Sequence, residues 1–105
     1  MQENQEEDNR PDPTARRFRE EHHKFLRDNR PDVLAGLRQS GSLDSYLSSV
    51  GETASERLEH ALSQHLSDPE VQKLPFPARV RELQNRRQSE EEVIRHDLIH
   101  QPLED

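Results

Sequence analysis

Apolar side chains recur along this chain at helical spacing, most clearly over residues 43–66. Their positions advance in steps of three and four residues, which places them in one stripe on a single face of a helix. The stripe consists of Leu43, Leu47, Val50, Ala54, Leu58 and Ala61, and Leu62 lies at its edge. Such steps are typical of a coiled-coil seam. We therefore expect a long central amphipathic helix whose stripe is covered by other helices or by a second copy of the chain.

Gly51 lies inside this expected helix, where glycine costs about 1 kcal/mol relative to alanine. Ser49 and Glu52 have the spacing of a capping box, so a break at 49–52 is an alternative. We favour one continuous helix because the stripe keeps its phase across Gly51.

Shorter helices are expected before the central one. Asp12-Pro13 has the form of a helix start, with a capping carboxylate followed by proline at the first helical position. It predicts a helix over about 13–28. Pro31 then bends the chain, because the residue before a proline avoids helical geometry, and it opens a short helix over about 31–38.

Prolines separate the central helix from the last one. Two of them flank Phe76, and we expect this side chain to close the edge of the core from a rigid connector. The last helix should run from about 78 to 100. Its apolar face carries Val80, Leu83, Ile94 and Leu98.

Together these patterns predict an all-α fold, since no stretch alternates apolar and polar positions as a strand does. The expected architecture is a small helical bundle of three main helices plus one short helix. It occupies residues 13–101, between a disordered acidic N-terminal tail (1–12) and a C-terminal tail (102–105).

Composition limits what such a bundle can do. Apolar residues make up 28% of the 105 residues and charged residues 35%, which leaves little for a large core or for an apolar small-molecule pocket. No run approaches the roughly 20 apolar residues of a membrane span, and the polar N-terminus is unlike a signal peptide. We therefore expect a cytoplasmic protein that does not enter membranes.

Catalytic motifs are missing from the sequence. It has no cysteine, only three glycines and no Gly-rich phosphate loop, so we expect no enzyme, no cofactor and no catalytic residue.

His96 and His100, like Glu56 and His60, have the i, i+4 spacing of metal ligands. No third ligand is fixed by the sequence, and we expect no metal site. His65 falls in the apolar stripe of the central helix, where we expect a histidine at the core edge with one bonded nitrogen; a pH-sensitive pairing surface is the alternative.

Two sets of polar residues are candidates for binding a partner. Gln84, Arg87 and Glu91 interrupt the apolar face of the last helix, where a retained ion pair can fix partner choice. Alternatively, this turn simply faces water. The second set lies on the first helix and consists of Arg16, Arg17 and Lys24. Glutamates stand among these basic residues, as is typical of a solvated helix face.

Several short motifs follow one another in a fixed order along residues 18–99. They are FLRDNRP at 25–31, SGSL at 40–43, YL at 46–47, ERL at 56–58, NRR at 85–87, EEVI at 91–94 and LI at 98–99. This order resembles TnpV, a family of small proteins encoded by transposons. The resemblance implies an accessory protein of a mobile element, with an excisionase-like or regulatory DNA role and no catalytic residue. The acidic start and the proline-rich stretch 67–77 depart from the family pattern.

Two functions therefore fit the sequence. The first is a non-enzymatic accessory or regulatory protein of a mobile genetic element that binds a protein partner, such as a recombinase, a regulator or a host-defence component. The alternative is a small DNA-binding protein of the excisionase-like or regulatory kind. A net charge of −7 favours the first, because DNA binders are typically basic. A homodimer through the stripe of the central helix is compatible with either function. One continuous basic stripe on the surface would favour DNA, whereas interspersed charges beside an apolar groove would favour a protein.

Overall fold

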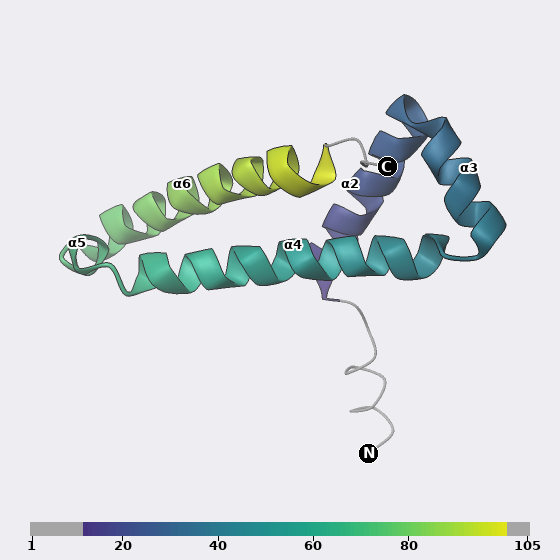
Figure 1. The fold of residues 1–105 in the computed structure, drawn as a ribbon. Coiled ribbons are helices and arrows are strands. Elements are labelled where there is room, and N and C mark those ends of the chain that lie inside the picture. Colours follow the sequence, from purple (N-terminus) through teal and green to yellow (C-terminus); the bar gives the residue numbers. More distant parts are fainter. Residues whose placement is uncertain (1–11, 101–105) are drawn as a thin grey trace, which may run out of the picture.

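The computed structural model describes residues 12–100, and within that range every regular element is a helix (Figure 1). The elements are α2 (Pro13–Asn29), α3 (Pro31–Ser40), α4 (Leu43–Leu66), α5 (Pro69–Gln72), α6 (Phe76–Ile94) and the π-helical turn η1 (Arg95–Ile99). The predicted all-α bundle is confirmed, and α4 is one continuous helix through Gly51, as its stripe indicated. The expected tails at 1–11 and 102–105, and residue 101, lie outside the described residues.

The segment between α4 and α6 differs from the prediction. Phe76 does not close the core edge, because 72% of its side chain is exposed. Proline is tolerated in the first turn of a helix, so Pro77 continues the chain into α6 and makes Phe76 the first residue of that helix. The connector also contains α5, whose Val71 is the buried side chain of this segment.

Helix α4 is the central helix, and the other helices pack against it (Figure 1). Helix α2 packs along its first half, and Asp12, the N-cap of α2, accepts a hydrogen bond from the Ser55 hydroxyl at 2.8 Å. Helix α6 runs back along the second half of α4, antiparallel to it, with α5 at the turn. Beyond Ser55 the chain therefore forms a two-helix arm, which we define as residues 59–90.

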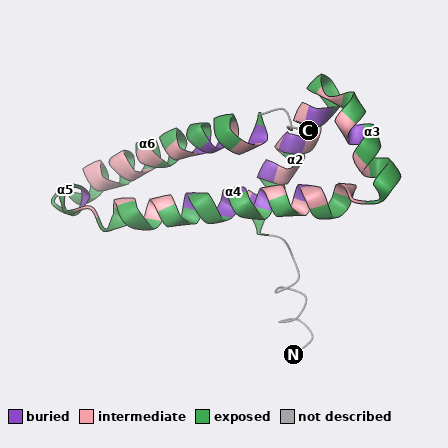
Figure 2. Cartoon of the chain, viewed as in Figure 1, coloured by how far each residue is buried: buried purple, intermediate pink, exposed green. Residues whose placement is uncertain are grey.

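The buried side chains gather where α2 meets α4 (Figure 2). One cluster joins three elements and consists of Phe18, Ala54, Leu58, Ile94 and Ile99. A second cluster lies toward α3 and consists of Leu26, Leu34 and Leu47. Toward the outer end of the arm, by contrast, Leu66 and Val80 stay exposed.

His22 connects the two clusters. Its Nδ1 lies 2.7 Å from the carbonyl oxygen of Ile99, and its Nε2 lies 2.7 Å from the hydroxyl of Tyr46. A carbonyl can only accept, so Nδ1 carries the proton and the Tyr46 hydroxyl donates to Nε2. Burial lowers the pKa of His22, and the neighbouring His100 lowers it further, against the opposing effect of the Ile99 carbonyl. The neutral imidazole therefore ties α2 to both α4 and η1.

Replacing Leu47, which is buried between α2 and α3, tests the packing of α4. We expect Leu47→Ala to lower the free energy of unfolding by about 2–5 kcal/mol, because it leaves a cavity. Leu47→Asp should abolish cooperative unfolding, since it buries an unpaired charge. Urea denaturation followed by circular dichroism measures both. An unchanged transition in Leu47→Asp would show that the stripe of α4 does not form the core.

The lowered pKa of His22 makes the stability of the fold depend on pH. Because its pKa in the folded chain is lowered, the unfolded chain takes up the proton first as the pH falls. The contribution of His22 to stability is therefore complete above about pH 6.5, the ordinary pKa of histidine, and declines below it by up to about 1.4 kcal/mol per pH unit. Urea midpoints of the wild type and His22→Gln between pH 7.5 and 5 measure this decline. A stability difference between the two proteins that is constant over this range would contradict the prediction.

Candidate partner-binding groove

An apolar groove lies along the arm, between α4 and α6. It is a hollow of about 280 Å³ lined by Leu62, Leu66, Val80, Leu83, Gln84 and Arg87. Leu66 is 56% exposed although it continues the spacing of the buried stripe, because nothing in the described chain covers this end of α4. The groove thus presents a row of aliphatic side chains with two polar ones, from α6, in its wall.

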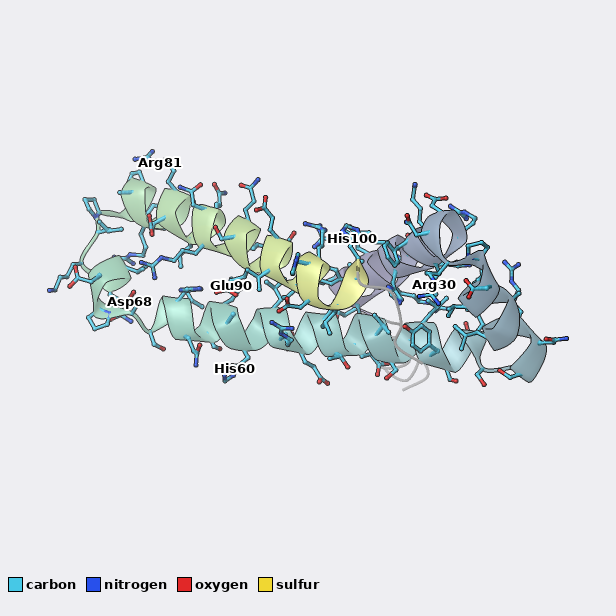
Figure 3. The ribbon with its side chains drawn as sticks, turned by 45° about the horizontal axis from the view of Figure 1, so that its top comes forward. Arg30, His60, Asp68, Arg81, Glu90 and His100 are labelled. Carbon is cyan, nitrogen blue, oxygen red and sulfur yellow. The ribbon has the colours of Figure 1, made fainter. Side chains whose placement is uncertain are left out.

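A ladder of polar side chains beside the groove holds the arm together. Glu90 accepts from Nε2 of His65 at 2.8 Å, while the guanidinium of Arg86 reaches Nδ1 of His65 at 3.2 Å. Arg86 also binds Asp68 at 2.8 Å and Glu82 at 2.7 Å. Figure 3 shows Asp68 and Glu90 on the inner side of the hairpin, whereas His60 and Arg81 point outward. His65 is half-buried at the edge of the core, as predicted, but both of its nitrogens have partners.

A cluster of charges closes the inner end of the groove. Glu91 is buried and lies 2.9 Å from Arg87, 3.2 Å from Arg17 of α2 and 3.4 Å from Arg95. Arg95 also binds Glu21 at 2.8 Å. Burial raises the pKa of Glu91, but hydrogen bonds from Arg87 and Arg17 outweigh this effect and hold the pKa below its usual value. Glu91 is therefore ionised at neutral pH and links α2 to α6.

The six candidate residues from the sequence separate into two groups. Gln84 and Arg87 line the groove, and Glu91 and Arg17 meet at its inner end. The other two lie elsewhere: Lys24 pairs with Asp28 at 2.7 Å, and Arg16 lines a different hollow between α2 and α4. Of the three candidates on α2, only Arg17 therefore reaches the interrupted face of α6.

Two residues of this region were not predicted from the sequence patterns. Leu66 follows Leu62 by four residues, so extending the stripe by one turn would have included it. Arg95 gave no signal, because its position beside Glu91 and Glu21 depends on the packing of α2 against the end of α6.

Charges of both signs alternate over the described surface. Arg19 is paired with Asp44, Arg57 with Asp97, and Arg86 with two carboxylates. Basic residues that could contact a phosphate backbone are thus largely engaged by carboxylates of the same chain. This pattern removes much of the positive field on which nucleic-acid binding depends.

Neither metal ligands nor membrane spans stand out between residues 12 and 100. Within that range no three His, Asp or Glu side chains come together as a metal site would require. His96 lies beside Asp97, and His60 beside Gln64. The helices of the same range also lack the combination of length and apolar character that crossing a bilayer demands.

Comparison with known proteins adds no relative: no family model, no curated protein and no solved structure matches this chain. The similarity to TnpV suggested by the order of motifs stays a prediction from sequence.

Proposed function

We propose that this chain is a non-enzymatic accessory or regulatory protein of a mobile genetic element, which acts in the cytoplasm by binding a protein partner in the groove of its arm. The link to a mobile element is supported by the TnpV-like order of motifs over residues 18–99. The mode of action is supported by the groove and by the distribution of charge around it.

The exposed aliphatic wall of the groove carries the proposal. Three of the four exposed large hydrophobic residues in the described chain, Leu66, Phe76 and Val80, belong to the arm. Two of them, Leu66 and Val80, line the groove together with Leu62 and Leu83. Single exposed apolar residues are ordinary, but apolar residues gathered around a hollow mark an interaction surface. In a chain with only 28% apolar residues, leaving this set uncovered is costly unless a partner covers it.

Binding to DNA is the second candidate and is less well supported. It needs a continuous basic face, and the most basic part of α2 contains Arg16, Arg17 and Arg19. Arg17 is bound to Glu91, and Arg19 is bound to Asp44. Because Arg19 is paired with Asp44 and Arg17 shares Glu91 with Arg87 and Arg95, these residues do not form the continuous basic face that binding to a phosphate backbone needs.

A pair of matched variants tests the proposed site. We expect Leu66→Glu to reduce capture of the partner by about tenfold or more, the effect of losing a hot-spot side chain. Val93→Glu is the control, because Val93 is 49% exposed on the same helix pair but does not line the groove. Capture uses cells that carry the parent element, with nuclease treatment, and quantitative mass spectrometry of the retained proteins. Thermal melts of both variants verify that the fold is intact.

Two results would contradict the proposal. Equal capture by Leu66→Glu and the wild type would remove the groove from the binding site. Alternatively, nuclease could abolish all specific capture while the chain shifts DNA in a gel with an affinity that falls steeply as salt increases. That outcome would establish DNA as the partner.

A further inference from the structure

We infer that the groove accepts one amphipathic helix of the partner protein, which presents aliphatic side chains at helical spacing and a carboxylate toward Arg87. This inference rests on the proposed function, because it specifies the partner of the same groove.

The helix pair α4 and α6 already binds a third helix farther along the molecule. Phe18 of α2 belongs to the same buried cluster as Leu58 of α4 and Ile94 of α6. Helix α2 begins at the level of Ser55, where its N-cap Asp12 is bound, so among residues 12–100 no third helix covers the arm beyond this level (Figure 1). A helix in the groove would pack against α4 and α6 on the arm, as α2 packs against them in the core.

The groove and α2 lie on the same side of the helix pair. Arg87 lines the groove, Arg17 belongs to α2, and both guanidinium groups bind the same oxygen, Oε2 of Glu91. One end of an incoming helix would therefore lie beside α2, at this shared ion pair.

The dimensions of the groove suit about two turns of a helix. Its wall on α6 runs from Val80 to Arg87, about 10 Å at 1.5 Å per residue. Side chains at i, i+4 and i+7 of an occupant span a similar distance, and helices that bind in grooves use this spacing. Leu62, Leu66 and Leu83 would contact them.

The charges at the inner end favour a carboxylate on the occupant. Among the described residues, the cluster contains three guanidinium groups, from Arg17, Arg87 and Arg95, but only two carboxylates, from Glu21 and Glu91. It therefore holds one excess positive charge in a chain whose net charge is −7. The side chains of Arg17 and Arg87 are 44% and 46% exposed, so a further partner can reach them. A carboxylate is the natural partner of a guanidinium group with free donors.

The arm is already organised for binding without an occupant. The ladder around Arg86 and His65 joins α4 to α6, and Arg79 donates to the carbonyl oxygens of Gln72 and Leu74 at the turn. These bonds lie outside the groove and do not have to break when it is filled. A preformed groove requires little ordering on binding, which favours affinity for a single helix.

Two designed peptides test the inference on the full-length chain. Both are fluorescein-labelled, Ala/Gln-based helices with Leu at i, i+4 and i+7. One carries Glu at i−4 and i+11, so that either orientation brings a carboxylate to Arg87, and its twin carries Lys at both positions. Fluorescence anisotropy should show the wild type binding the Glu peptide about tenfold tighter than the Lys peptide. Added salt should reduce this preference.

Variants of the chain locate the interaction. Arg87→Gln should lose the preference between the peptides, and Arg87→Glu should reverse it. Leu66→Glu should abolish binding of both peptides, whereas Val93→Glu should behave like the wild type. Thermal melts of each variant ensure that a loss of binding is not a loss of folding.

Each contrary result overturns a defined part of the account. Equal affinity for the two peptides would remove the carboxylate from the inference. If neither peptide binds while capture of a partner still depends on Leu66, the helix is wrong but the proposed function stands. Sedimentation showing a dimer that Leu66→Glu dissociates would establish a second copy as the occupant and overturn the inference. If neither capture nor peptide binding depends on Leu66, the proposed function fails as well.

Discussion

The close contact between α2 and α4 at Gly51 is the constraint on which the rest of the structure depends. A Cβ atom at this position would lie 2.4 Å from the carbonyl oxygen of Ala15, so only glycine allows the two backbones to approach this closely. With α2 seated here, Phe18 enters the core and Arg17 reaches the buried carboxylate of α6. The cost of a glycine within a helix, about 1 kcal/mol, is offset by the burial that the contact permits. Because α2 begins near this contact, the arm beyond it keeps its groove open.

Helical periodicity was sufficient to predict most of the fold. The bounds of α4 at 43 and 66, its continuity through Gly51 and the cap at Asp12 all follow from local spacing and local hydrogen bonds. The end of the last helix did not follow from it. An α-helical pattern placed Leu98 with Ile94 on the inner face, and Leu98 does pack half-buried against that cluster. The wider π-helical turn over 95–99 in addition buries Ile99 completely beside Ile94. Tertiary packing selects this turn, and nothing in the local sequence indicates it.

The sequence predicted only some of the residues that form the candidate site. A polar interruption on an apolar helix face is a local signal, and it identified Gln84, Arg87 and Glu91, which do meet at the groove and its inner end. The groove itself forms because no third helix among residues 12–100 covers this part of α4, and the hydrophobic pattern of one helix does not show which of its apolar residues stay uncovered. Arg16 was grouped with Arg17 because they are neighbours in sequence, although adjacent residues on a helix face different directions.

Stability measurements on two glycine variants test the central contact most directly. Gly36 lies in α3 with nothing within 4 Å of an added Cβ, whereas an added Cβ at Gly51 would collide with the backbone of α2. Urea denaturation should show that Gly36→Ala raises the free energy of unfolding by about 0.5–1 kcal/mol, through better helix propensity. Gly51→Ala should lower it by about 1–3 kcal/mol, because the two helices must move apart. An increase in stability for Gly51→Ala like that for Gly36→Ala would show that α2 does not pack on α4 in this way.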